Sequence, residues 1–201
     1  MSARPAAPKL VFHAVDQARW PDLERLFESR GGPKSCWCMV WRATPAEART
    51  PQGAARKRAL ALRVQDGTPI GLLGYLGDEP VAWCSIAPKS TYRRLDGPGG
   101  DRSRSEPAAT TRADSIWSLA CFFVTRRLRG QGVTAQLIEA AAYHARQAGA
   151  TIIEAYPVDP DSPSYRFMGF LPVLEAAGFH PVGRAGTRRH VVQRRLGRAA
   201  K

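Results

Sequence analysis

The sequence contains no long apolar run. None of its 201 residues lies in a stretch that approaches the ~20 apolar residues of a membrane-spanning helix. The first ten residues, MSARPAAPKL, also lack the apolar centre of a signal peptide. These two absences predict a cytoplasmic protein with no membrane partner.

Cysteine is scarce, with four residues in the chain. Cys84 and Cys121 lie in apolar, strand-like runs, where cysteine usually serves as a small buried hydrophobic residue. Cys36 and Cys38 form a C-x-C pair that is too close for an ordinary strain-free disulfide and lacks the second Cys/His pair of a structural zinc site. We therefore expect no bound metal.

Acidic residues are also few. The chain has 17 Asp and Glu against 30 Lys and Arg, which gives a net charge of +13. Such a balance favours a polyanionic partner, either a phosphate-rich cofactor or a nucleic acid. The arginines are spread from Arg4 to Arg198, and no aromatic-interleaved RNA-binding signature is present. We therefore favour the cofactor and regard nucleic-acid binding as the weaker hypothesis.

Two common nucleotide-binding motifs are missing. The chain has no Gly-Lys-Ser/Thr of a Walker A loop. Gly130-Gln131-Gly132 matches only the first part of the dinucleotide motif G-x-G-x-x-G, and Glu154, near the expected distance, lies inside a predicted strand. A dinucleotide site is weakly supported and stays open.

A phosphate site is nevertheless predicted in the segment from Ser115 to Leu137. An apolar run, Ile116 to Val124, predicts a buried strand, and a basic turn with two glycines separates it from an amphipathic helix that begins near Val133. Glycine lets the turn backbone approach a ligand, and the helix start directs N–H groups and its positive dipole end at an anion.

The rest of the chain predicts a mixed sheet with helices on both faces. Hydrophobic periodicity and turn residues predict strands at residues 9–15, 70–76, 80–87, 116–124, 151–156, 179–182 and 188–193. The same signals predict helices at residues 16–29, from 44 onward, 54–64, 133–147 and 171–177. Because a helix crosses between the fourth and fifth strands, we expect those two to be parallel.

We expect one domain, residues 9–193. Residues 1–8 are predicted to be a loose N-terminus and residues 194–201 a basic, frayed tail. The polar, Gly/Pro-rich segment 96–114 is predicted to be a flexible loop, either a lid over the phosphate site or a plain surface insertion.

Four sequence features resemble one family. The turn Arg127-Leu128-Arg129-Gly130-Gln131-Gly132 has the pattern R-x-x-G-x-G, which resembles the acyl-coenzyme A signature of the GNAT (GCN5-related) N-acetyltransferase superfamily. The run LACFFVTRRLRGQGVTAQLI resembles the family's strand–loop–helix segment, and LEAAGF at residues 174–179 resembles its closing segment. The strand at residues 151–156 falls where the family's next parallel strand is expected. The resemblance covers about residues 10–192 and is strongest over 116–182.

The resemblance implies a fold and an activity. The fold is a single GNAT-like α/β domain whose sheet is largely antiparallel, with one parallel strand pair that splays apart. The activity is transfer of an acetyl group from acetyl-coenzyme A, as co-substrate, to a primary amine of a small molecule by direct attack. The resemblance also allows a homodimer.

The donor site is expected in the signature loop and the strand before it. Backbone N–H groups of the loop surround the pyrophosphate, arginines add charge-assisted contacts, and the strand offers main-chain groups to the pantetheine arm, as the resemblance implies. The predicted donor-binding residues are Phe122, Val124, Arg127, Leu128, Arg129, Gly130, Gln131, Gly132 and Val133.

The sequence also contains candidates for the catalytic acid and base. Leu174 occupies the position where many family members carry a tyrosine that protonates the departing thiolate, so that role is vacant or has moved. Tyr165 is the nearest substitute, although a structural tyrosine is an alternative. Glu154 is the best-placed carboxylate for a general base. The alternative is that Glu154 is a structural strand residue in a salt bridge. The missing tyrosine also motivates a second hypothesis, a non-catalytic acyl-coenzyme A binding or sensing module.

Tryptophans mark the predicted acceptor side. Ser35 to Arg42, SCWCMVWR, is either a core-facing connector or one wall of a substrate pocket. In the second interpretation Trp37 and Trp41 contact the acceptor, together with Trp83 from a later strand. The protein's positive charge and the absence of an acidic cluster disfavour a polycationic acceptor, so we expect a small amine or an amino-acid-like molecule.

Overall fold

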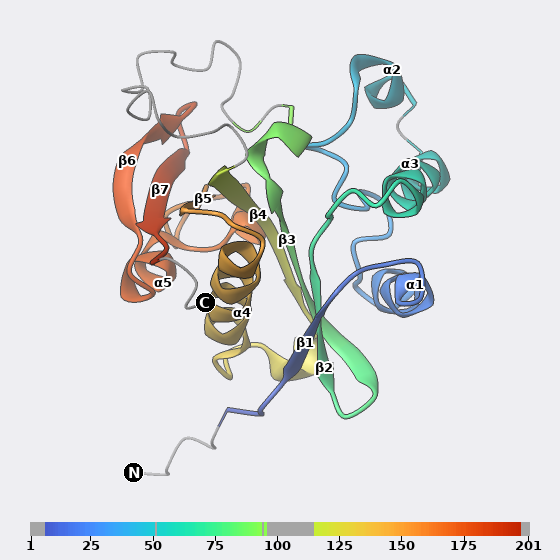
Figure 1. The fold of residues 1–201 in the computed structure, drawn as a ribbon, viewed down its shortest axis with the longest axis horizontal. Helices are drawn as coiled ribbons and strands as arrows, with labels where there is room; N and C mark the ends of the chain where they lie inside the picture. The colour runs from blue at the N-terminus through green and yellow to red at the C-terminus, as the bar shows by residue number, and fades with distance from the viewer. Residues whose placement is uncertain (1–6, 51, 94, 96–114, 198–201) are drawn as a thin grey trace.

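The computed structural model describes residues 7–50, 52–93, 95 and 115–197 (Figure 1). The predicted loop at 96–114 lies outside the described residues, as do most of the predicted N-terminal and C-terminal tails. The described chain forms one seven-stranded sheet in the order β1-β2-β3-β4-β5-β7-β6. Every neighbouring pair is antiparallel except β4 and β5, which are parallel as predicted.

The elements follow the predicted order. The strands are β1 (Val11–Ala14), β2 (Leu72–Leu76), β3 (Glu79–Pro88), β4 (Ile116–Val124), β5 (Ile152–Ala155), β6 (His180–Ala185) and β7 (Arg189–Arg195). The helices are α1 (Trp20–Glu28), α2 (Pro45–Ala48), α3 (Gly53–Gln65), α4 (Val133–Gln147) and α5 (Leu171–Ala176). Short 3₁₀ turns are η1 (Lys89–Thr91), η3 (Arg126–Leu128) and η4 (Arg166–Met168).

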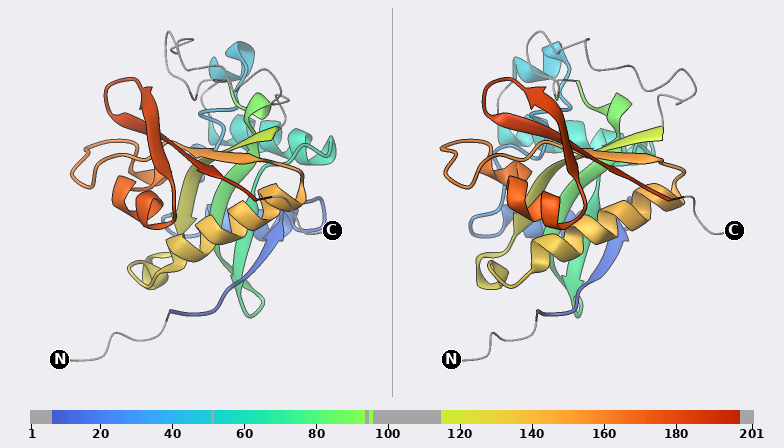
Figure 2. Two further views of the ribbon diagram at one scale, coloured as in Figure 1. Left: turned by 60° about the vertical axis from the view of Figure 1, so that its left-hand side comes forward. Right: turned by 90° about the vertical axis from the view of Figure 1, so that its left-hand side faces the viewer.

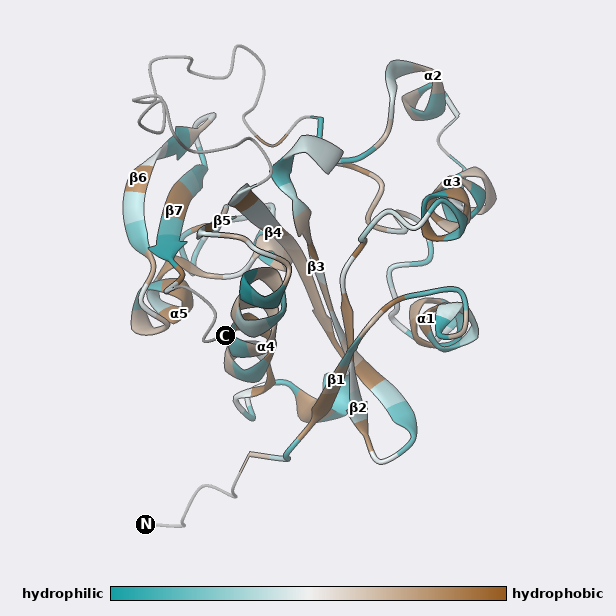
Figure 3. Cartoon of the chain, in the orientation of Figure 1, coloured by the Kyte–Doolittle hydropathy of each residue, from teal (hydrophilic) through white to brown (hydrophobic). Residues whose placement is uncertain are grey.

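The sheet has a hydrophobic core on each face. Leu72 and Cys84 pack on the face covered by α4, whereas Leu73 and Trp83 pack on the opposite face with α1 and α3. This alternation follows from the two-residue side-chain period of a strand. Figure 2 shows α4 on one side of the sheet and α3 on the other, and Figure 3 shows apolar residues concentrated in the central strands.

Two predicted boundaries were wrong. The first helix was expected from Asp16, but α1 begins at Trp20. The Asp16 carboxylate accepts a hydrogen bond from Arg19 N (2.9 Å), so Asp16 closes a turn that precedes the helix. Residues 194–195 were predicted to belong to a frayed tail, yet β7 continues to Arg195 because Arg194 and Arg195 pair with Ile153 and Ile152 of β5.

The parallel strands part midway along β4. Their pairing ends at Leu119 and Ala155, while β4 continues to Val124. At the same level Ser85 pairs with Cys121 and Ile86 with Leu119, so Ala120 is an extra residue in β4, a β-bulge. A bulge bends the strand that carries it. Beyond Leu119, β4 is therefore no longer paired with β5, and a gap opens between the two strands.

Candidate active site

A groove lies where β4 and β5 part. It has a volume of about 690 Å³. One wall is the end of β4, the loop after it and the start of α4, and the other wall is η4 with the start of α5. The lining residues are Phe122, Phe123, Val124, Leu128, Arg129, Gly130, Gly132, Val133, Thr134, Ala135, Arg166, Phe167, Gly169, Phe170 and Val173.

The backbone of β4 presents polar groups to this groove. Thr125 N donates to Val81 O (2.9 Å), so Thr125 faces β3. Val124 O accepts instead from Arg129 Nε (3.0 Å), on the groove side. Because successive backbone groups alternate along a strand, the polar groups of Phe122 face the same side as those of Val124. Two main-chain positions of β4 are thus directed at a ligand in the groove.

The start of α4 forms an anion site at one end of the groove. Gly132 has φ +79° and is the N-cap residue, and among the described residues no side chain caps the helix. The first hydrogen bond of the helix runs from Gln136 N to Gly132 O (3.3 Å). The N–H groups of residues 133–135 come before this bond and therefore have no acceptor within the helix. These residues line the groove, and N–H groups at a helix start attract phosphates.

The opposite wall depends on a glycine that the sequence analysis did not single out. Gly169, at the end of η4, has φ +89°, and a Cβ there would lie 3.1 Å from the Phe122 ring and 3.2 Å from Leu174. The absence of a side chain lets η4 approach β4 closely. Arg166, Phe167 and Phe170 were also missed, because this segment has no helical or strand periodicity. The pair Gly169-Phe170, a glycine followed by an aromatic residue, was the one local signal for this wall of the groove.

Two predicted donor-binding residues lie outside the groove lining. The Arg127 guanidinium forms an ion pair with the Glu79 carboxylate at the protein surface. The Gln131 side-chain amide donates to Arg127 O (2.7 Å). The other predicted donor-binding residues all line the groove.

The family model for the acetyltransferase (GNAT) family matches residues 12–170. The chain belongs to the GNAT acetyltransferase family. The protein is therefore an acyltransferase of this family. No curated protein matches the chain.

Solved structures share this fold at low identity. The GNAT domain of S. lividans PAT superimposes with a TM-score of 0.57 at 17% identity, over 93% of this chain and 90% of that one. An N-acetyltransferase from Staphylococcus aureus Mu50 gives 0.54 at 11% identity, over 94% and 99%. The GNAT family N-acetyltransferase YhbS from Escherichia coli, solved in complex with CoA, gives 0.51 at 14% identity, over 98% and 86%.

Glu154, the predicted base, is buried on the sheet face opposite α4. Its Oε1 accepts from Lys89 Nζ (2.8 Å) and from the Tyr156 hydroxyl, and its Oε2 accepts from Gln193 Nε2 (2.7 Å). Glu154 pairs in register with Ser118 of β4, one residue before the strands part. Tyr156, which the sequence analysis missed, is the first residue after β5 and is fully buried.

Tyr165 and Trp41 belong to an aromatic cluster around a buried arginine. The Arg189 guanidinium carbon lies 4.5 Å from the centre of the Trp41 ring, 5.5 Å from that of Tyr165 and 5.9 Å from that of Tyr156. The Tyr165 ring is 6.3 Å from that of Phe167, which lines the groove. Trp41 and Tyr156 pack in one core with Ala120, the bulge residue. The structure therefore places this cluster next to the point where β4 and β5 part.

The connector at residues 35–42 is anchored by Arg42. Its guanidinium donates to Tyr92 OH (2.7 Å), Thr91 Oγ1 (3.0 Å) and Ile70 O (3.0 Å). Burial lowers the pKa of this guanidinium. Since these acceptors are neutral, the arginine fixes the end of the connector through hydrogen bonds and thereby positions Trp41.

Trp37 and Trp83 were predicted to contact the acceptor, but the structure places both in the core. Trp83 has no exposed surface and Trp37 is 2% exposed. The Trp37 ring lies 5.8 Å from that of Trp20 and 5.2 Å from that of Phe27, and Trp83 donates its Nε1–H to Cys38 Sγ (3.2 Å). Side chains along β3 alternate between the two faces of the sheet, and Trp83 lies on the face that packs against α1 and α3. We assign both residues to packing.

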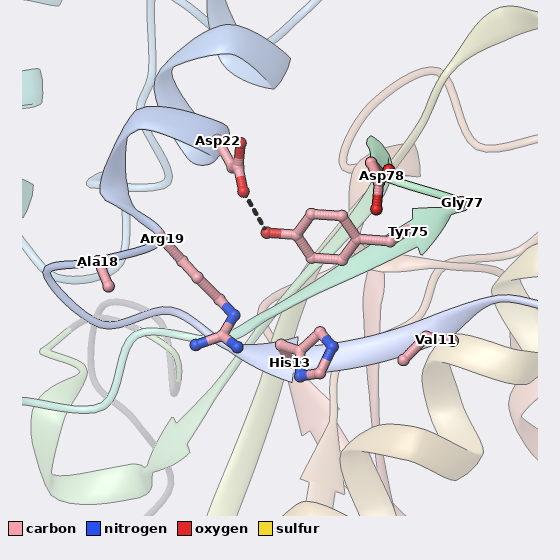
Figure 4. Close-up of a pocket in the computed structure, with 8 residues that line it drawn as sticks. All are labelled: Val11, His13, Ala18, Arg19, Asp22, Tyr75, Gly77 and Asp78. Atoms are coloured by element: carbon pink, nitrogen blue, oxygen red, sulfur yellow. Dashed lines mark hydrogen bonds between the residues drawn. The ribbon is translucent and has the colours of Figure 1, made fainter.

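Another cavity of the structure lies away from the groove. This second cavity, of about 510 Å³, lies beside β1, α1 and the β2–β3 turn and shares no lining residue with the groove. In it the Tyr75 hydroxyl donates to Asp22 Oδ2 (2.8 Å), and burial together with this bond raises the pKa of Tyr75 (Figure 4). Nothing in this second cavity adjoins the β4–β5 gap.

The part of the chain that the structure describes has neither a membrane-spanning helix nor a metal-binding group of side chains. None of its helices is long and apolar enough to cross a membrane. Within the same residues, no group of three or more His, Cys, Asp or Glu side chains has an arrangement suited to a metal ion.

Proposed function

We propose that the protein transfers an acetyl group from acetyl-coenzyme A to the primary amine of a small molecule. The observation that carries the proposal is the groove at the β4–β5 gap, with an uncapped helix start at one end and main-chain groups of β4 along its side. A phosphate-bearing thioester with a long polar arm has the chemistry that fits these features.

In this proposal each part of the donor has a place. The N–H groups of Gly130, Gly132 and residues 133–135 surround the pyrophosphate, and Arg129 supplies a charge-assisted contact. The main-chain groups of Phe122 and Val124 bind the pantetheine amides. Arg127 and Gln131 contribute through their backbone alone, since their side chains are engaged at the surface.

The acetyl transfer is a direct attack. The neutral amine nitrogen forms a bond with the thioester carbonyl carbon, the carbon–sulfur bond breaks, and the sulfur leaves as a thiolate. We assign the proton released by the amine to Glu154, through the Tyr156 hydroxyl that it binds. We assign protonation of the thiolate to Tyr165, because Leu174 at the family's usual position is fully buried.

The acceptor site is proposed at the aromatic cluster of Trp41, Tyr156 and Tyr165. Among the described residues, the buried Trp41 Nε1 and Ser118 Oγ have no hydrogen-bond partner, so both are available to a polar ligand. The Arg189 guanidinium within the cluster favours an acceptor that carries an anionic group beside its amine, as does the net charge of +13. An amino-acid-like acceptor meets both conditions.

The experiment is a coenzyme A release assay with acetyl-coenzyme A and a panel of primary amines, half of them amino acids. We expect at least one amino acid to accelerate release above hydrolysis. Tyr165→Phe is expected to lower kcat by roughly 10²-fold, the scale of general acid catalysis, whereas Tyr143→Phe on the exposed face of α4 changes nothing. If Tyr165→Phe retains full turnover, the tyrosine is not the acid.

One observation favours a second candidate, an acyl-coenzyme A binding or sensing module. Leu174 packs in the core at the position of the family's catalytic tyrosine. Tight binding of acetyl-coenzyme A by calorimetry, together with release that no amine accelerates, would favour this module over the enzyme.

A further inference from the structure

Three of the four cysteines meet at one place beside the groove. Cys36 and Cys38 belong to the connector, and Cys121 belongs to β4, immediately before Phe122. Cys38 Sγ lies 3.4 Å from Cys121 Sγ, and Cys38 N donates to Cys36 Sγ (3.2 Å). Cys84 lies apart from them, in the core on the other face of the sheet.

The Cys38 and Cys121 thiols are in contact although 83 residues separate them. A disulfide needs its sulfur atoms about 2.0 Å apart, so a small approach of the connector toward β4 would close the bond. Cys38 is 5% exposed and Cys121 is 6% exposed, and the Trp83 indole N–H also donates to Cys38 Sγ (3.2 Å). The two sulfur atoms thus already lie in contact within the core.

Access to this pair is through Cys36. Cys36 is partly exposed, whereas the other two thiols are buried. The neighbouring Cys38 side chain and burial raise the pKa of the Cys36 thiol, and they outweigh the Cys38 backbone N–H, whose hydrogen bond to Cys36 Sγ lowers it. The hydrogen bond with Cys121 and burial raise the pKa of Cys38. The Cys36 and Cys38 thiols are therefore protonated at neutral pH, so thiol–disulfide exchange through them is slow there and becomes faster as the pH rises.

We propose that Cys38 and Cys121 are a redox modification site, which forms a reversible disulfide on exposure to a low-molecular-weight disulfide such as oxidised glutathione. The Cys36 thiolate attacks the reagent and releases one thiol. Cys38 then attacks the Cys36 sulfur and releases the second thiol, and Cys121 attacks the Cys38 sulfur of the strained C-x-C bond and returns Cys36 to a thiol. Two protein thiols are oxidised and one reagent disulfide is reduced to two thiols.

The disulfide has a consequence for the groove. Cys121 lies between the bulge residue Ala120 and Phe122, whose main-chain groups face the groove. A bond that draws Cys121 toward the connector displaces β4 at this point. We expect the affinity for acetyl-coenzyme A to fall about fivefold, the low end of ordinary coupling between sites. This consequence rests on the proposed donor site, whereas the disulfide does not.

The test treats the full chain with oxidised glutathione and maps the products by mass spectrometry. The expected product joins tryptic peptides 35–42 and 113–126, and a reducing agent reverses it. Cys121→Ser and Cys38→Ala each abolish the crosslink, so the result does not depend on the folding of one variant. Cys36→Ser slows its formation, and Cys84→Ser leaves it unchanged.

Each result decides the proposal. A crosslink confined to Cys36 and Cys38, a glutathione adduct on Cys36 alone, or no product overturns it. Calorimetry with acetyl-coenzyme A on the reduced and oxidised proteins tests the coupling, and equal affinities overturn that part. If neither form binds acetyl-coenzyme A while the crosslink still forms, the donor site fails and the modification site stands.

Discussion

Two arginines that are two residues apart have different roles in the groove loop. The Arg127 guanidinium pairs with Glu79 at the surface, while the Arg129 guanidinium donates to Val124 O beside the groove. The sequence motif contains both and does not distinguish them. Arg127 lies within η3 and Arg129 is the residue that follows it, so this tight turn directs the two side chains to different sides.

Arg129→Gln is expected to weaken binding of acetyl-coenzyme A about tenfold or more. The substitution removes a charge-assisted contact to the phosphates, which is worth about 1.5–3 kcal/mol. Arg127→Gln is the matched control and is expected to change binding less than twofold, since the Arg127 guanidinium pairs with Glu79 and Arg127 lies outside the groove lining. Calorimetry on the three proteins measures both effects. Equal losses in the two variants would contradict the assignment of Arg129.

Gly130→Ala is expected to weaken donor binding about tenfold. Gly130 has φ +75°, a conformation that costs an L-residue roughly 1–2 kcal/mol. An alanine relieves this strain by turning the loop N–H groups away from the groove, and 1.4 kcal/mol corresponds to a factor of about ten. Gly186→Ala, in the β6–β7 turn at φ +73°, is the control with the same backbone strain. If Gly186→Ala weakens binding equally, the effect is one of stability.

At the scale of elements, the short helix α2 depends on its ends. Thr44 accepts a hydrogen bond from Glu47 N (3.2 Å), and the Glu47 carboxylate accepts one from Thr44 N (2.7 Å), which forms the predicted capping box. Arg63 of α3 adds a bidentate ion pair to the same carboxylate, at 3.0 and 2.9 Å. Glu47 therefore connects α2 with α3, and Arg63 also donates to Arg42 O at the end of the connector of the proposed acceptor site.

The stability that Glu47 contributes is expected to depend on pH. Hydrogen bonds from Arg63 lower the pKa of Glu47 from 4.5 to about 2. A lowered pKa means that the contribution is complete above the unfolded value and is lost as the pH falls through the folded value. Glu47→Gln keeps the capping box but removes the charge paired with Arg63, so it should destabilise the protein by up to about 1 kcal/mol at neutral pH, and the difference should shrink between pH 4.5 and pH 2.

Urea unfolding of the wild type and of Glu47→Gln at several pH values measures this difference. Glu139→Gln is the control, because Glu139 forms an exposed ion pair with Arg194. Its effect is expected to stay below about 0.5 kcal/mol at every pH. A pH-independent loss in Glu47→Gln would show that the carboxylate charge is not what stabilises α2.

At the scale of the whole molecule, one sheet supports the hydrophobic cores on its two faces. Leu137 of α4 and Leu23 of α1 are both fully buried, on opposite faces. Since adjacent residues of the same strands enter both cores, neither face can lose its packing while the other keeps its strands. The groove and the cysteine cluster belong to this shared framework.

We therefore expect unfolding in a single transition. Leu137→Ala and Leu23→Ala should each cost about 2–5 kcal/mol and shift the same transition. Tryptophan fluorescence and far-ultraviolet circular dichroism should give coincident midpoints in all three proteins, because Trp117 reports on one core and Trp37 and Trp83 on the other. Midpoints that separate in one variant would show that the two faces unfold independently.

The sequence alone determined the local elements of this protein. The bounds of β4 and α4, the capping box at Thr44 and the glycine turn between β4 and α4 follow from side-chain periodicity, capping and backbone preference, which act over a few residues. The helix between the fourth and fifth strands predicted that these strands are parallel, and the family resemblance added their splay. The predicted lining of the groove by Gly130, Gly132 and Val133 depended on the same short-range signals.

The tertiary structure decided which distant residues meet. Trp83 faces the core and Ala120 bulges because of strand register, and a shift of one residue would reverse the face of each side chain. The meeting of Cys38 with Cys121, and of Arg189 with Trp41, depends on contacts between segments far apart in the chain. No local pattern encodes such contacts, because their free energy arises only when both segments are packed on the same sheet.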